Sequence, residues 1–295
     1  MYDDIRYVVE NPVALITLDR PDSLNAWTDA MGAEVEDALR RAAADPRVVG
    51  IVITGAGRAF CAGADMKVLQ TLSGGSPSNG SSSGGSSDGE GGGGSAGDVA
   101  TETSPADPED DFGGRFPSVM AIDKPVIAAV NGAVAGMAYP FVLCCDLRIV
   151  SPDALFLTAF AQRGLIAEWG LSWLLPRLVG PAVALDLLFS SRRVGGEEAV
   201  RLGLANELVP ADRLVDHCRA YVEQLARTSS PASMAVMKRQ VYEQLHRGLG
   251  AAEREAQRLM VESFARPDFA EGVRSFVEKR APDFARLGAP DAPDA

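Results

Sequence analysis

The stretch from Lys124 to Gly170 constrains the fold more than any other part of the chain. Its apolar run Val126 to Val130 shows no polar alternation, which predicts a strand covered on both faces. Asn131-Gly132 ends that strand, the apolar run Met137 to Cys145 predicts a short helix, and Asp146 to Val150 predicts a second strand. A strand, a helix and a strand in this order indicate an α/β protein.

Two features of this stretch indicate chemistry. Gly136 lies just before the predicted helix, so backbone N–H groups at the helix start are free to face an oxyanion. Glu168 is the lone carboxylate of the segment GLIAEWG, and apolar neighbours raise a carboxyl pKa toward neutral pH. We therefore predict that Glu168 is the acid/base residue. The alternative is an exposed loop carboxylate that pairs with Arg163.

The flanking segments extend the α/β pattern. Residues 5–18 predict a β-hairpin at a sheet edge, residues 28–45 a capped helix, and residues 48–54 a buried strand. The glycine-rich loop GAGRAFCAGADM that follows matches neither the dinucleotide fingerprint nor the phosphate-loop spacing. Amphipathic helical patterns then fill the end of the chain. We expect a core at residues 1–205 and a helical oligomerisation region at residues 206–295.

An insert of different composition interrupts the core. From about residue 72 to residue 111 the chain is dominated by Gly, Ser, Asp, Glu and Pro, and includes SSSGGSSDGEGGGGSAGD. Such a segment has too little apolar surface to offset the entropy lost on ordering. The sequence therefore predicts a disordered insert.

The overall charge and hydropathy exclude several classes of partner. The net charge of -12 argues against a surface that follows nucleic-acid phosphates. The start MYDDIRYVVE lacks the apolar core of a signal peptide, and no apolar run reaches the length of a membrane span. We expect a cytoplasmic protein with neither a nucleic-acid nor a membrane partner.

The cysteines and histidines do not form a recognisable site. No metal-ligand set and no Ser-His-Asp arrangement can be drawn around His217 and His246, which we expect on the surface. The four cysteines have neither zinc-ligand spacing nor the density of a disulfide scaffold. Reduced thiols in the core are therefore expected at Cys61, Cys144, Cys145 and Cys218.

Five short motifs follow one another along the chain. They are Arg20-Pro21 with Leu24-Asn25-Ala26, then Phe60 to Asp65 (FCAGAD), Lys124 to Gly132 (KPVIAAVNG) with Gly136, Cys145-Asp146, and Phe276 to Arg280 (FVEKR). Taken together, these motifs resemble those of the crotonase superfamily, the enoyl-CoA hydratase and isomerase family. They occur in the family's order and span nearly the whole chain apart from the insert. The resemblance implies an α/β fold, a crotonase-like spiral of ββα units with a C-terminal helical trimerisation region.

The resemblance also implies a site. The backbone N–H groups of Ala64 and Met137 would form an oxyanion hole for a thioester carbonyl that becomes an enolate. The loop Ala62, Gly63 and Ala64 would border the adenine of coenzyme A. Phe276 and Lys279 would reach the nucleotide of a neighbouring subunit in a homotrimer or hexamer. The resemblance implies an acyl-CoA thioester as substrate, with no permanently bound cofactor and no metal.

This chain departs from the hydratase pattern at both catalytic carboxylates. The positions that carry Glu in the family's hydratases are here Pro140 and Phe160. Pro140 is tolerable in the first turn of a helix, where its missing N–H has little cost. The segment around Glu168 instead resembles the loop of dienoyl-CoA isomerases, in which one acidic residue moves a proton along the acyl chain.

The expected reaction follows from these departures. One carboxylate suffices for a double-bond shift, because the same group removes a proton and returns it elsewhere. We therefore favour an isomerase slightly over a hydratase, with Glu168 as acid/base. Two alternatives stay open: an enoyl-CoA hydratase with an atypical site, and a non-catalytic acyl-CoA-binding protein.

Overall fold

The computed structural model describes residues 1–65 and 111–288. The predicted insert, apart from Asp111, lies outside the described residues. In the described part, no helix is long and apolar enough to cross a membrane. The cytoplasmic location stays a prediction.

The larger of two sheets has six strands in the order β1-β2-β3-β5-β7-β10. β1 and β2 form the predicted antiparallel hairpin at one edge, and the remaining neighbours are parallel. Every residue of β3 and β5 is buried, as the apolar runs predicted. The strands are β1 (Ile5–Glu10), β2 (Val13–Leu18), β3 (Gly50–Gly55), β5 (Val126–Val130), β7 (Leu147–Val150) and β10 (Glu207–Leu208).

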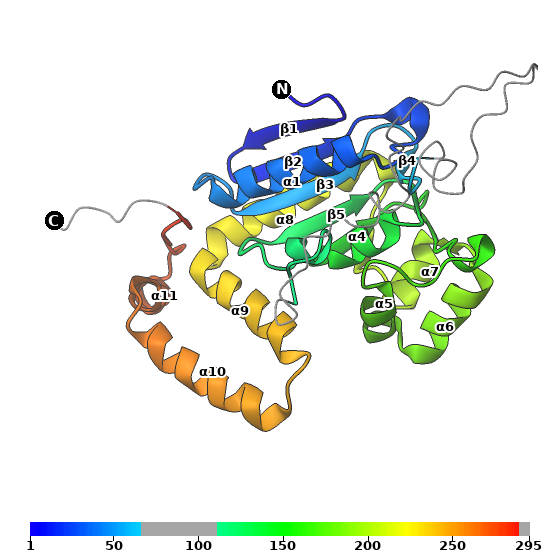
Figure 1. Ribbon diagram of the computed structural model, residues 1–295. Helices are drawn as coiled ribbons and strands as arrows, with labels where there is room; N and C mark the ends of the chain where they lie inside the picture. Colours follow the sequence, from blue (N-terminus) through cyan, green and yellow to red (C-terminus); the bar gives the residue numbers. More distant parts are fainter. Residues whose placement is uncertain (66–110, 289–295) are drawn as a thin grey trace, which may run out of the picture.

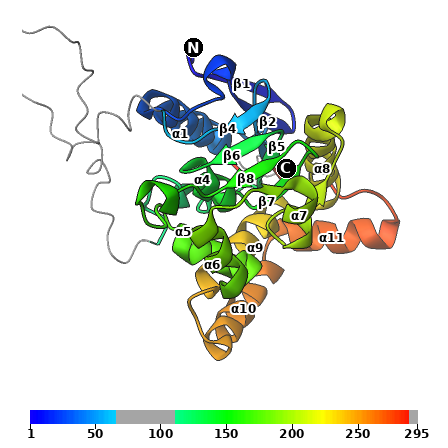
Figure 2. The same ribbon diagram turned by 90° about the vertical axis from the view of Figure 1, so that its right-hand side faces the viewer.

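A second sheet of four short strands has the order β4-β6-β8-β9. Its members are β4 (Ala59–Cys61), β6 (Ala133–Ala135), β8 (Leu155–Leu157) and β9 (Val194–Gly195). β4, β6 and β8 run parallel and lie side by side in Figure 2. Each follows a strand of the larger sheet, so the chain alternates between the two sheets, and α4 (Ala138–Cys144) connects β6 to β7. This is the expected spiral of ββα units.

Helices cover both faces of the larger sheet. α1 begins after Thr28, whose hydroxyl accepts a hydrogen bond from the Met31 N–H, as expected for an N-cap. α8 packs on the opposite face through Cys218 and Val222. The helices are α1 (Asp29–Ala44), α4 (Ala138–Cys144), α5 (Leu171–Val179), α6 (Pro181–Ser190), α7 (Gly196–Arg201), α8 (Leu214–Thr228), α9 (Pro231–Gln244), α10 (Leu249–Phe264) and α11 (Pro267–Glu278).

The last three helices extend away from this body (Figure 1). α9 is held to it by Asp146, which accepts hydrogen bonds from Lys238 Nζ at 2.8 Å and Tyr242 Oη at 2.7 Å. α10 has no buried residue, and both α10 and α11 expose large apolar side chains. The division into residues 1–205 and 206–295 stays a prediction.

Candidate active site

Two glycines meet where neighbouring strands of the second sheet end. β4 leads to Gly63 and β6 leads to Gly136, and these strands are parallel, so both glycines lie at the same edge. A Cβ on Gly63 would lie 2.6 Å from the Ala135 carbonyl oxygen, and the Gly63 φ is +93°. Only glycine fits this approach without strain. The close contact places the two following residues, Ala64 and Met137, at one edge.

The N–H groups of these two residues are the candidate oxyanion hole. Ala64 forms a parallel bridge with Trp27 whose two hydrogen bonds use the Gly63 oxygen, at 2.7 Å, and the Asp65 N–H, at 3.1 Å. The Ala64 N–H therefore donates no hydrogen bond within this bridge. Met137 caps α4, where the first N–H groups have no partner within the helix. Within residues 1–65 and 111–288, neither N–H donates a hydrogen bond.

Residues of the first motif hold in place the loop from Ala62 to Asp65, the oxyanion loop, which carries the Ala64 N–H. Asn25 is fully buried, and its side-chain amide donates to the carbonyl oxygens of Ala56 and Ala59. Arg20 forms ion pairs with Asp4 and Asp65, each at 3.4 Å. The motif that resembles the crotonase pattern thus fixes the backbone on both sides of Gly63.

Glu168 lies in the loop between η3 (Ala161–Arg163) and α5. Its side chain is half-buried, and burial raises the pKa of the carboxyl above its ordinary value, while a hydrogen bond with Trp169 opposes the rise. The alternative partner, Arg163, donates instead to the Ala159 oxygen at 2.9 Å. Among the described residues Glu168 has no ion pair. Its role as the acid/base group stays a prediction.

Four aromatic side chains join the Glu168 loop to the oxyanion loop. The Trp169 and Phe116 ring centroids are 5.5 Å apart, Phe116 is 5.5 Å from both Trp27 and Phe141, and Trp27 and Phe141 are 5.0 Å apart. The Arg115 guanidinium lies 5.7 Å from the Trp169 ring centroid. Sequence reasoning missed this cluster, although Trp27 directly follows the Leu24-Asn25-Ala26 motif.

The two positions that carry Glu in hydratases are apolar and enclosed here. Pro140 is buried in the first turn of α4, where proline is tolerated as expected. Phe160 is 5% exposed and directly precedes η3. Neither position supplies a carboxylate, and Glu168 stays the candidate acid/base group.

The remaining candidates are structural. All four cysteines are buried and unpaired, and burial raises the pKa of each thiol, which makes them poor nucleophiles. His217 contacts Glu207, and His246 stacks on Trp173 with ring centroids 5.0 Å apart. The described residues contain no group of His, Cys, Asp or Glu side chains that would hold a metal ion.

Phe276 and Lys279, which were expected to reach the nucleotide of a neighbouring subunit, lie at the end of α11. Figure 1 places α11 and β4 at opposite ends of the molecule. The structure therefore does not bring Lys279 to Ala62, Gly63 and Ala64 of the same chain. Lys279 ends its helix with a φ of +53°, in the left-handed region that normally takes glycine. For a side chain such as Lys this conformation costs about 1 kcal/mol or more.

Comparisons with known proteins show the family to which the chain belongs. The sequence matches the model of the Enoyl-CoA hydratase/isomerase family over residues 9–84 and 93–286. A probable enoyl-CoA hydratase of Rhodobacter capsulatus is 36% identical over 285 residues, covering 96% of this chain and 98% of that protein. The 1,2-epoxyphenylacetyl-CoA isomerase of Escherichia coli is 30% identical over 287 residues, covering 94% of this chain and 96% of that protein.

Solved structures show the same fold. The crystal structure of an enoyl-CoA hydratase from Polaromonas superposes with a TM-score of 0.79 at 27% identity, covering 95% of this chain and 99% of that one. An enoyl-CoA hydratase from Bacillus anthracis gives a TM-score of 0.81 at 24% identity, covering 97% of this chain and 100% of that one. The chain therefore belongs to the enoyl-CoA hydratase/isomerase family of the crotonase superfamily.

Proposed function

We propose that this protein isomerises a double bond in an acyl-CoA thioester through an enolate. The observations that support the proposal are the Gly63 and Gly136 framework and the carboxylate of Glu168, whose neighbour Trp169 reaches Trp27 through Phe116. Pro140 and Phe160 stand at the two positions where the family's hydratases carry the Glu residues used for hydration. A single carboxylate with a raised pKa suits proton movement within one substrate better than the addition of water.

In the proposed reaction Glu168 begins as a carboxylate. It removes a proton from the acyl chain, and the electron pair of the broken C–H bond moves toward the thioester carbonyl oxygen. The N–H groups of Ala64 and Met137 donate to that oxygen as its charge develops, and each such donor contributes about 3 kcal/mol. Glu168 then returns the proton to another carbon, so the double bond moves and no atom is gained or lost.

The raised pKa of Glu168 fits this role. A carboxylate at its ordinary pKa is a weak base, whereas a raised pKa increases the driving force for proton removal. The group must still be ionised at the start of the cycle. We expect activity to fall on the acid side, at a pH above the ordinary carboxyl value of 4.5.

Hydration by an atypical site is the second candidate, and the names of the relatives favour it. Several are named enoyl-CoA hydratase, whereas the relative from Escherichia coli is named an isomerase. In a hydratase with this sequence, Glu168 would have to activate water and also deliver the proton to the enolate. A protein that binds acyl-CoA without turnover is the remaining alternative.

A panel of substrates separates these three functions. Purified protein is assayed with trans-2-enoyl, 3-enoyl and 3,5-dienoyl thioesters of coenzyme A, beside the variants Glu168→Gln and Glu197→Gln. Glu197 is an exposed carboxylate on α7 and serves as the matched control. We expect double-bond migration that falls about 100-fold or more in Glu168→Gln and is unchanged in Glu197→Gln. Hydration that survives Glu168→Gln would overturn the proposal, and calorimetric binding without turnover would identify a binding protein.

We further propose that the helical region assembles the protein into trimers or hexamers. Large apolar side chains are at least 50% exposed along α10 and α11, including Val261, Phe264, Val273 and Phe276. Such a surface on a single chain favours association. Because α11 lies far from the oxyanion loop of its own chain, Phe276 and Lys279 would serve the coenzyme A bound to a neighbour. Light scattering on the purified protein measures the mass, and a monomer at micromolar concentration would contradict this proposal.

A further inference from the structure

The C-terminal end of α11 contains a strained backbone conformation at Lys279. The Arg280 N–H donates to the Ser275 oxygen at 3.1 Å and the Lys279 N–H donates to the Phe276 oxygen at 3.3 Å, which together make a Schellman motif. The left-handed position of that motif usually takes glycine, but here it takes Lys279. A strained backbone of this kind persists only where its surroundings hold it in place.

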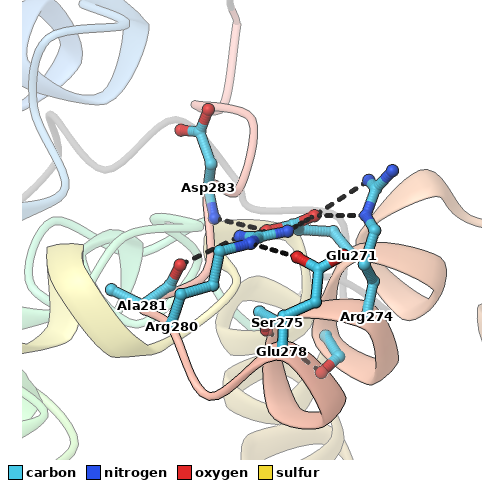
Figure 3. Close-up of polar contacts among 8 residues, drawn as sticks. Glu271, Arg274, Ser275, Glu278, Arg280, Ala281 and Asp283 are labelled. Carbon is cyan, nitrogen blue, oxygen red and sulfur yellow. Dashed lines mark hydrogen bonds and ion pairs between the residues drawn. The ribbon is translucent and has the colours of Figure 1, made fainter.

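Glu271 supplies the contacts that hold this turn. Its side chain is 9% exposed, and its two oxygens accept hydrogen bonds from both terminal nitrogens of Arg280, at 2.5 and 3.0 Å. The same carboxylate accepts from the Asp283 N–H at 2.8 Å (Figure 3). Glu271 therefore binds the chain directly after Lys279 through one side chain and one backbone group. Arg280 also donates to the Ala281 oxygen, which closes the turn.

The cations at this helix end differ in whether they form ion pairs. Arg274 pairs with Glu271 at 2.9 Å, and Arg280 pairs with both Glu271 and Glu278. Lys279 is exposed and has no ion pair within the described residues. It is thus the cation of this cluster that stays available to a ligand, in a chain of net charge -12. Phe276, one turn earlier, is 84% exposed and adds an aromatic face.

We propose that Glu271 is a positioning residue that presents Lys279, beside the exposed ring of Phe276, to the nucleotide half of an acyl-CoA bound to a second copy of this chain. A phosphate is the ligand that a free ammonium group binds, and an adenine stacks on an exposed aromatic ring. Glu271 does not touch the ligand. It fixes the turn so that Lys279 projects from it in one direction. This inference rests on the proposed function, because it requires an acyl-CoA substrate.

The test compares two substrates with the same acyl group. One is the coenzyme A thioester, and the other is the N-acetylcysteamine thioester, which lacks the nucleotide. We expect Lys279→Gln and Glu271→Gln each to raise KM for the coenzyme A thioester about tenfold, the effect of one lost charge-assisted hydrogen bond. kcat, and KM for the N-acetylcysteamine thioester, should stay within about twofold of wild type on the same reasoning.

A double variant separates positioning from a general structural role. If Glu271 acts through Lys279, KM for the coenzyme A thioester in Glu271→Gln/Lys279→Gln should equal that of Lys279→Gln alone. Effects that multiply to about 100-fold would overturn the inference, because independent contributions add in free energy. A rise in KM for both substrates would overturn it too, as would a Glu271→Gln variant with unchanged kinetics.

Two further variants keep the inference testable if Glu271→Gln folds poorly. Arg280→Lys keeps the charge but loses the planar fork on Glu271, and we expect the same selective rise in KM. Arg274→Gln is the matched control, because Arg274 pairs with Glu271 from within the helix and does not hold the turn. Unchanged kinetics in Arg280→Lys, or an equal effect in Arg274→Gln, would refute the positioning role.

Lys279→Gly tests the strain directly. Glycine accepts the left-handed conformation without a steric penalty, so this variant should raise the melting temperature while it raises KM for the coenzyme A thioester. Isothermal calorimetry with adenosine 3′,5′-bisphosphate gives a reading that does not depend on turnover. If the protein neither binds nor turns over either thioester, the proposed function fails and the positioning role fails with it. Turnover with no selective change in KM refutes the positioning role alone.

Discussion

Two adjacent cations on α9, Lys238 and Arg239, differ in burial. We therefore expect their substitution by Met to cause very different losses in the free energy of unfolding. The Lys238 side chain is 9% exposed, and its Nζ donates to Asp146 at 2.8 Å and to the carbonyl oxygens of Val119 and Lys124 at 3.3 and 3.2 Å. Arg239 is 58% exposed and makes one ion pair with Asp123, which is 55% exposed. Lys238→Met and Arg239→Met therefore remove the same charge from the same helix in two environments.

The expected magnitudes follow from this difference. Removing one partner of a buried ion pair costs about 3 to 5 kcal/mol, because the other charge is left uncompensated. Asp146 keeps the hydrogen bonds from the Val126 N–H and Tyr242 Oη, which places Lys238→Met at the lower end, about 3 kcal/mol. An exposed pair contributes less than about 1 kcal/mol, so Arg239→Met should be nearly neutral.

Urea unfolding at one fixed protein concentration measures both variants. With a denaturant slope of about 3 kcal/mol per molar, Lys238→Met should lower the midpoint by about 1 M, and Arg239→Met by less than about 0.3 M. Light scattering of the same samples shows whether the assembly changes when α9 is loosened. Equal midpoints for the two variants would refute the reasoning, because burial would then not decide the contribution of a charge at this helix.

Three further predictions concern the site and the end of α11. Gly63→Ala should lower activity about 100-fold by moving an oxyanion donor, whereas Gly164→Ala, also at a positive φ but with open space around it, should lose only about 1 kcal/mol of stability and little activity. In Trp169→Phe the hydrogen bond that lowers the Glu168 pKa is lost, so the acid limb of the pH–rate profile should move to higher pH; a move to lower pH would contradict this. Bonds to Arg280 and other donors lower the pKa of Glu271 from 4.5 to about 2, so its stabilisation is complete above the unfolded value and is lost as pH falls toward about 2. The difference in melting temperature between wild type and Glu271→Gln should shrink over that range, and a constant difference would show that ionisation is not the cause.

Local patterns predicted the longer elements because the order of apolar and polar residues within each element indicates which of its positions are buried. Val126–Val130 is the strand that the apolar run indicated, and α1, which Thr28 caps, is the capped helix expected at residues 28–45. The C-terminal helices occur in the part of the chain where amphipathic patterns were expected, because amphipathic spacing extends over several turns. The raised pKa of Glu168 also follows from its apolar neighbours in sequence, although which side chains surround it does not.

The second sheet could not be predicted in the same way. β4, β6 and β8 have three residues each, which is too short for a repeating pattern of polar and apolar side chains. Their pairing depends on strands that are far apart in the chain. The family resemblance implied such units, but no local signal marked them.

Contacts between distant residues also decided what surrounds the site. Trp27, Phe116 and Trp169 lie more than 50 residues apart from one to the next, and only the fold brings them into one cluster between the oxyanion loop and Glu168. The position of α11 far from β4 was likewise not readable from the sequence, since Lys279 matches its motif equally well in either arrangement. The sequence thus determined which groups we propose for the chemistry, because each is defined by its residue type and immediate neighbours. Tertiary structure decided how those groups are held, because packing and ion pairing join residues that the chain itself keeps apart.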